Sequence, residues 1–243
     1  MNNYTKIERS FKYWTRTDLE KILGLQRKKK LDVLENWLAM ESNFSLSQKE
    51  VIYLEELREE AEELIDYWNE TELRENFISL LTRLVRFKDS KNNFHHFAER
   101  YLSVNITIKP LYEVKLFGYT DWLVATGKSA PEQPFFFIHE YKPEEGKTID
   151  GRGQLLAEMC AAQILNQNPP MPTLFNQTPK HYYKDIPLYG VYVLGRMWFF
   201  MALKDREYSI SAAYDSMSKD DLQSIIKLLK AQKQLIYEVV KRA

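Results

Sequence analysis

The chain has 243 residues, of which 44% are hydrophobic and 28% are charged, a balance that predicts a globular protein and excludes a disordered one. Its 34 basic and 34 acidic residues give a formal net charge of zero, which counts against an avid, nonspecific nucleic-acid binder. The single cysteine, Cys160, excludes an intrachain disulfide and a cysteine-based zinc cluster. The sequence shows no signal-peptide core and no apolar run of membrane-spanning length, so we expect a soluble, cytoplasmic protein without a membrane partner.

The first 66 residues are highly charged, and we expect an N-terminal helical region over 1–66. Apolar residues recur there at the i, i+3, i+4 spacing of amphipathic helices, at Leu31, Leu34, Trp37 and Leu38 and again at Val51, Leu54, Leu57, Ala61 and Leu64. The remaining residues, 67–243, should form one α/β domain that ends in a helix. The pattern leaves open whether the N-terminal region packs onto this domain or stands apart.

A sharper helix start follows at Asn69. Glu72 lies three residues further on, so the two side chains can bind each other's backbone N–H groups in a capping box. The helix that this start predicts has a wide apolar face, formed by Phe77, Ile78, Leu80, Leu81, Leu84 and Val85.

Three extended segments come next, over 97–107, 114–126 and 135–142. The third is the most informative, because a run of large apolar side chains ends on Glu140 and Lys142. Alternate residues of a strand share a face, so these two side chains should project side by side. His139 should face the opposite way and pack in the core. In the second segment, Asp121 places a carboxylate near the start of an apolar stretch.

The rest of the pattern is a polar loop over 143–151, a helix over 153–165, strands over 188–193 and 197–203, and a closing helix over 222–240. The strand that ends at Lys142 and the strand that begins near Leu188 flank a helix, so we expect a parallel crossover between them. Ligands in such sheets favour the carboxyl ends of the strands, where Glu140 and Lys142 lie.

Other candidate residues are better explained by packing or by the surface. His95 and His96 are expected in a surface loop, where adjacent side chains diverge and make a poor metal chelate. The aromatic residues of the last two strands are expected to pack in the core rather than to stack on bases, at Tyr189, Tyr192, Trp198, Phe199 and Phe200.

The αβββαβ order, with Asp121 and the pair Glu140-x-Lys142, resembles the PD-(D/E)XK, or restriction-endonuclease-like, superfamily over about residues 69–203. The segments that look most like an uncharacterised bacterial family within it are 69–73, 77–78, 125–128, 135–142 and 153–156. Thr120 stands where proline often precedes the aspartate, at a position that varies widely in the superfamily. The resemblance implies a restriction-endonuclease-like core with a central mixed sheet flanked by helices.

The resemblance also implies a Mg²⁺ or Mn²⁺ ion held by the carboxylates of Asp121 and Glu140 and by the carbonyl oxygen of Tyr141. Mg²⁺ prefers oxygen ligands and retains several waters. Such an ion polarises a scissile phosphate and lowers the pKa of an attacking water. Lys142 would orient that water or stabilise the charge of the transition state.

Two further residues are candidates for the site. Superfamily members often carry an acidic residue on the first core helix, which would be Glu72, although its capping role explains it equally well. Glu99 is the weaker alternative. Gln154 matches a position where related nucleases place a polar residue that faces the site, and a contact at the helix N-terminus is the alternative explanation.

These residues favour a metal-dependent nuclease that acts on nucleic acid. DNA is the expected substrate rather than RNA, because most members of the superfamily that the chain resembles act on DNA. The alternative is a noncatalytic module of the same fold that binds or assembles partners, which the neutral net charge favours. A third hypothesis is a homodimer, or a subunit whose partner supplies target recognition, with the N-terminal helices as the interface.

Overall fold

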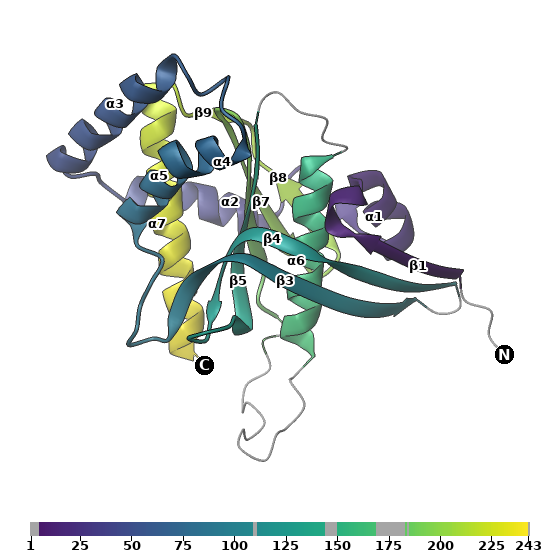
Figure 1. The fold of residues 1–243 in the computed structure, drawn as a ribbon. Helices are drawn as coiled ribbons and strands as arrows, with labels where there is room; N and C mark the ends of the chain where they lie inside the picture. The colour runs from purple at the N-terminus through teal and green to yellow at the C-terminus, as the bar shows by residue number, and fades with distance from the viewer. Residues whose placement is uncertain (1–4, 109–110, 144–149, 169–182, 184, 243) are drawn as a thin grey trace.

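A mixed β-sheet runs through the middle of the protein, and helices cover both of its faces (Figure 1). The computed structural model describes residues 5–108, 111–143, 150–168, 183 and 185–242, and within them the sheet has nine strands. This arrangement confirms the expected α/β class with a central mixed sheet flanked by helices. Most of the polar loop expected over 143–151 lies outside the described residues. None of the helices in the described ranges combines the length and the apolar character that a bilayer span needs.

Five strands form the centre of the sheet and follow the expected order. They are β3 (Phe94–Ile108), β4 (Tyr112–Thr126), β5 (Glu132–Lys142), β6 (Leu188–Leu194) and β7 (Met197–Lys204). The pairs β3–β4, β4–β5 and β6–β7 are antiparallel, whereas β5 and β6 run parallel and are joined through α6 (Gly151–Gln167). The expected parallel crossover is therefore confirmed. The short strands β8 (Glu207–Ile210) and β9 (Tyr214–Asp215) both pair with β7.

The N-terminal region expected to be helical contains helices, but two of its segments are strands that join the sheet. β1 (Thr5–Ser10) pairs in parallel with β4, and β2 (Gln26–Arg27) pairs in parallel with β8 at the other end of the strand order. Both strands are short and largely exposed, so no apolar alternation marks them in the sequence. The helical elements of this region are η1 (Phe11–Tyr13), α1 (Arg16–Leu23), α2 (Asp32–Ala39), η2 (Met40–Asn43) and α3 (Gln48–Glu62).

The core has two layers, one on each face of the sheet. α2, α3, α5 (Ser79–Val85) and α7 (Lys219–Arg242) cover one face, and α1 and α6 cover the other (Figure 1). Trp37 of α2 lies at the centre of the first layer, where its ring meets Phe137 edge-on at 5.9 Å and its Nε1 donates to the Leu228 carbonyl at 2.9 Å. The N-terminal region therefore packs onto both layers of the core.

The first helical segment after the N-terminal region begins at Asn69. It consists of α4 (Glu70–Leu73), the π-helical turn η3 (Arg74–Ile78) and α5. The Asn69 side chain accepts from the Glu72 N–H at 3.1 Å, and Glu72 Oε2 accepts from the Asn69 N–H at 2.9 Å, which confirms the capping box.

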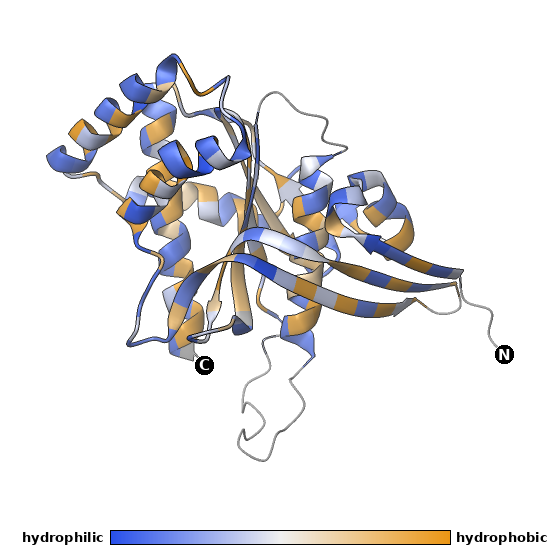
Figure 2. Ribbon diagram, in the orientation of Figure 1, coloured by the Kyte–Doolittle hydropathy of each residue, from blue (hydrophilic) through white to orange (hydrophobic). Residues whose placement is uncertain are grey.

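β3 and β4 continue as a long ribbon beyond the residues that pair with β5, and hydrophobic and hydrophilic residues alternate along it (Figure 2). β1 pairs with this ribbon at β4 residues 112–117, and β5 pairs with β4 at residues 122–126. Because β3 occupies the other edge of β4 along its whole length, β1 and β5 share one edge, end to end. The part of β4 between these two partners, 118–121, leads directly to the candidate site.

Candidate active site

Three charged side chains come together where β5 leaves β4. Asp121 lies on β4, and Glu140 and Lys142 lie on β5. Their neighbours at alternate positions, Leu123 and Ile138, pack in the α6 layer, which places all three charged groups on that face of the sheet. Lys142 Nζ is 2.5 Å from Glu140 Oε1 and 4.0 Å from Asp121 Oδ2. The structure therefore brings together the residues on which the sequence prediction depends.

The end of the β4–β5 ladder creates the space for these groups. The last backbone pair of the ladder is Trp122 with His139. One step further, Asp121 Oδ2 accepts a hydrogen bond from the Tyr141 N–H at 2.8 Å, so a side chain replaces the backbone partner that β4 no longer offers. This bond fixes the Asp121 carboxylate against β5, next to the alternate positions that carry Glu140 and Lys142.

α6 adds a carboxyl group that the sequence analysis did not identify. Glu158 is completely buried on α6, and its Oε1 accepts from Gln154 Nε2 at 3.2 Å. Gln154, four residues earlier on the same helix face, therefore bonds to an acidic residue of the site rather than to the three charged groups themselves. A glutamate inside an Ala- and Leu-rich buried helix is the signal that could have revealed Glu158, because glutamate is almost never fully buried without a partner.

The carboxyl groups of this cluster resist ionisation. Burial raises the pKa of Asp121, and it raises the pKa of Glu140 well above its ordinary value, with the charge of Asp121 adding to the effect. Burial and the charges of Glu140 and Asp121 likewise raise the pKa of Glu158 well above its ordinary value. Burial alone would lower the pKa of Lys142, but the carboxylates of Glu140 and Asp121 outweigh burial and raise it, so its ammonium stays charged.

The acidic residue of the first core helix that reaches the cluster is Glu70, not Glu72. Glu70 Oε2 lies 3.3 Å from Lys142 Nζ. Glu72 instead uses its carboxylate in the capping box, on the exposed side of the helix start. Glu99 pairs with Arg74 at 2.8 Å, and its side chain is largely exposed. Of the two glutamates of α4, Glu70 therefore lies at the cluster and Glu72 caps the helix.

The opposite face of β5 is packed with aromatic rings. His139 is fully buried, its Nδ1 lies 3.2 Å from the Tyr141 hydroxyl, and its ring centroid is 4.7 Å from that of Trp122. Burial lowers the pKa of His139 to about 3, so the ring is neutral, as expected for a packed histidine. The Tyr141 side chain points into this layer, so only its backbone is available on the side of the cluster.

The carboxylate oxygens of the cluster are suitable ligands for a hard divalent cation, but their present arrangement is not a complete site. Oε2 of Glu140 and Oε2 of Glu158 are buried without a hydrogen-bond partner among the described residues, and Oε1 of Glu140 contacts the Lys142 ammonium. Carboxylate oxygens are the ligands that Mg²⁺ and Mn²⁺ favour. Within the described part of the chain, however, no three His, Cys, Asp or Glu side chains form a group that could hold a metal ion as they stand. The Lys142 ammonium lies against Glu140, so an ion that binds there has to displace it.

Basic side chains gather beside the cluster, at the start of α6. The Arg152 guanidinium lies over the Phe199 ring, 4.0 Å from its centroid, and burial and the nearby charges of Arg16 and Arg27 lower its pKa. Burial raises the pKa of Tyr192 to about 12, and the charges of Lys142 and Arg152 oppose this rise, so both groups lie near its hydroxyl. In the sequence, the run of four basic residues at 27–30 is the signal that could have indicated this basic group.

No protein-family model matches the chain, and no curated protein matches its sequence.

Proposed function

We propose that this protein is a metal-dependent nuclease of the PD-(D/E)XK type that acts on DNA. The observation that carries the proposal is the convergence of Asp121, Glu140 and Lys142 at one point of the sheet, on a single face. The order α4–α5, β3, β4, β5, α6, β6 resembles the restriction-endonuclease-like core, with the three residues at the strand positions that the superfamily uses.

In this proposal the carboxylates of Asp121 and Glu140 hold a Mg²⁺ or Mn²⁺ ion, with the Tyr141 carbonyl oxygen as a further ligand. Such an ion, when bound by these residues, would supply Lewis acidity toward the scissile phosphate and lower the pKa of a water nucleophile. Glu158 lies behind Glu140 and, with its raised pKa, holds a proton that can be released when positive charge enters the cluster.

Lys142 supplies a fixed positive charge on the side of the cluster that remains partly accessible. Its side chain is 15% exposed, so once an ion displaces it from Glu140 it can meet a substrate phosphate while Glu70 still holds it. An ammonium in this place stabilises the negative charge that develops on a pentavalent phosphorane, and removal of such a group costs about 10²–10³-fold in rate.

The basic residues at the start of α6 support a polyanionic substrate. Arg152 and Lys142 both lie near Tyr192, and the charges of Arg16 and Arg27 reach Arg152, although Arg16 itself pairs with Asp150 at 3.0 Å. Although the chain as a whole is neutral, this local surface is suited to phosphates along a nucleic-acid backbone.

The test is cleavage of plasmid, linear duplex, single-stranded DNA and RNA in Mg²⁺ or Mn²⁺. We expect metal-dependent cleavage by the unmodified protein and a loss of at least about a hundredfold in Lys142→Ala. Lys115→Ala is the matched control, because Lys115 also lies on the central sheet and also pairs with a glutamate, Glu8, at 2.5 Å, but away from the cluster. Cleavage that survives Lys142→Ala, or that Lys115→Ala lowers equally, contradicts the proposal.

One observation favours the noncatalytic alternative. The 2.5 Å contact between Lys142 and Glu140 occupies the position that an ion needs, and a buried ion pair of this kind can serve the fold alone. A binding module of this fold predicts that none of the four substrates is cleaved and that Mg²⁺ and Mn²⁺ leave the melting temperature unchanged.

A further inference from the structure

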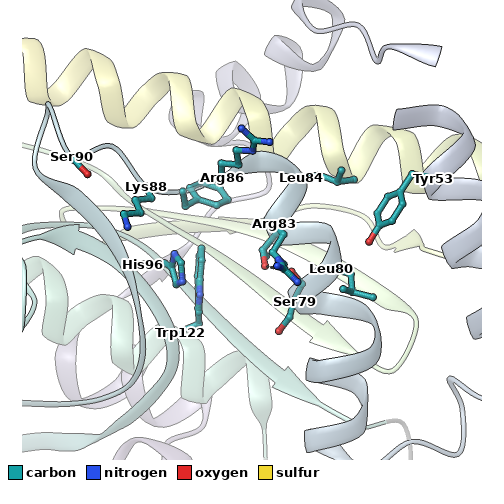
Figure 3. Close-up of a pocket in the computed structure, with 12 residues that line it drawn as sticks. Tyr53, Ser79, Leu80, Arg83, Leu84, Arg86, Lys88, Ser90, His96 and Trp122 are labelled. Atoms are coloured by element: carbon teal, nitrogen blue, oxygen red, sulfur yellow. Dashed lines mark hydrogen bonds between the residues drawn. The ribbon is translucent and has the colours of Figure 1, made fainter. Parts of the chain in front are cut away.

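A second group of polar and aromatic side chains lies on the other face of the β4–β5 pair. They line a hollow of about 910 Å³ between the end of α5, the turn that follows it, and strands β3 and β4 (Figure 3). Its principal lining residues are Tyr53, Arg83, Arg86, Lys88, His96 and Trp122. The hollow is separate from the carboxylate cluster, since Trp122 faces it while the preceding residue, Asp121, faces α6.

The hollow carries positive charge without a matching acid. Arg83, Arg86 and Lys88 are exposed, and none of them makes an ion pair within the described residues. No aspartate or glutamate is among the described residues that line the hollow. The acid nearest in sequence, Asp89, accepts hydrogen bonds from the Tyr237 hydroxyl at 2.7 Å and from the backbone of the 91–92 turn. A concave surface of this kind attracts anions.

The side chains of Arg83 and Lys88 are not needed to cap the C-terminal end of α5. The Arg86 backbone N–H donates to the Thr82 carbonyl at 3.1 Å, and Lys233 Nζ donates to the Val85 carbonyl at 3.1 Å. The carbonyls at the C-terminal end of the helix therefore have other donors, and the side chains of Arg83 and Lys88 are left to face solvent.

The hollow also has an aromatic wall. The His96 ring stacks on Trp122 with centroids 5.5 Å apart and an interplanar angle of 19°. Trp122 is held from behind by Phe87 at 5.3 Å and by His139 at 4.7 Å, so the stack rests on a rigid base. His95 and His96 lie on β3 rather than in the expected loop, which is why His96 can reach Trp122. Figure 3 shows the stacked pair between Lys88 on one side and Arg83 on the other.

We propose that this hollow binds a nucleoside phosphate, with the base on the His96–Trp122 stack and the phosphate held by Arg83, while Lys88 adds positive charge on the other side of the stack. Flat aromatic rings give a nucleobase a surface on which to stack. Guanidinium and ammonium groups supply charge-assisted hydrogen bonds to phosphate oxygens. The hydroxyl of Ser79, which lies beside Arg83 on the lining, offers a further hydrogen bond to the sugar (Figure 3). This inference is independent of the proposed nuclease function, because it concerns binding at a different surface.

The test is titration of the full chain with AMP, with adenosine and with inorganic phosphate, followed by calorimetry. We expect AMP to bind more tightly than adenosine or phosphate alone, because only AMP uses both the stack and the cations. Arg83→Ala/Lys88→Ala should lower AMP affinity at least about tenfold, since each charge-assisted hydrogen bond contributes on that order. His96→Ala should lower it roughly fivefold or more through loss of stacking.

The matched control is Lys12→Ala/Lys21→Ala, which removes the same charge from exposed positions near α1, on the other side of the sheet. All variants change exposed residues, and circular dichroism checks that each is folded. The proposal is overturned if AMP binds no better than phosphate, or if the control lowers affinity as much as Arg83→Ala/Lys88→Ala does. It is also overturned if a single-stranded oligonucleotide binds the hollow far more tightly than AMP, which would assign the surface to nucleic acid.

Discussion

The two faces of the β4–β5 pair differ sharply, although residues on them alternate along the same strands. One face carries Asp121, Glu140 and Lys142, charged groups taken out of water beside α6. The other carries Trp122 and His139, rings packed into the main core layer. Burial of charge opposes folding, whereas burial of aromatic rings favours it. The aromatic face therefore stabilises a strand pair whose other face is arranged at a cost in stability, which is the usual sign of a functional site.

The largest effect on stability is expected from the aromatic face. Trp122→Ala removes a buried ring that contacts Phe87 and His139, and it should lower the free energy of unfolding by about 3–5 kcal/mol. Asp121→Asn, one residue earlier, should change it far less, because an amide keeps the shape and removes an ionisable group whose pKa burial has raised. Urea denaturation of both variants measures the difference. Equal losses would mean that the charged face contributes to stability as the core does.

An intermediate effect is expected from pH. The pKa values of Glu140 and Glu158 are higher in the folded protein than in the unfolded chain. At any pH between the unfolded and the folded pKa values, the folded state therefore binds more protons than the unfolded state. Stability of the metal-free protein should therefore be greatest below the unfolded pKa of about 4.5 and fall as pH rises from there through the raised folded pKa values.

Glu158→Gln should flatten this dependence, because the glutamine does not titrate. Thermal unfolding at several pH values, with Glu99→Gln as a control at an exposed glutamate, provides the measurement. Stability that rises with pH over this range would show that the buried carboxyls are stabilised as anions.

The smallest effects on stability and cleavage are expected from substitution of the two glutamates of α4, Glu70 and Glu72. Glu72→Ala removes one half of a capping box and should lower stability by about 0.5–1 kcal/mol without a change in cleavage. Glu70→Ala removes a partly exposed partner of Lys142 and should change cleavage a few-fold with little effect on stability. A nuclease assay and a denaturation curve on each variant distinguish them. The reverse result would restore Glu72 to the site.

The strand pattern and the three central residues could be predicted from the sequence because both depend on short-range rules. Alternation along one strand puts Glu140 and Lys142 on the same face, and the order of elements puts Asp121 on the neighbouring strand. The parallel crossover through α6 follows from the same order.

What could not be predicted depends on how distant elements dock. Glu158 reaches the site only because α6 packs on β5 with that face inward, and Glu70 reaches Lys142 across 72 positions of the chain. β1 and β2 form because free edges of the sheet are available to them, which their own residues do not indicate. Likewise, the stack of His96 on Trp122 requires the β3–β4 register.

The most direct measurement of the central claim is calorimetric binding of Mn²⁺ at about pH 8, where the ion competes best with protons on the buried carboxyls. The account predicts that the unmodified protein binds Mn²⁺, that Asp121→Asn and Glu140→Gln each abolish binding, and that Glu99→Gln leaves it unchanged. Binding that survives both substitutions, or no binding by the unmodified protein, would contradict it.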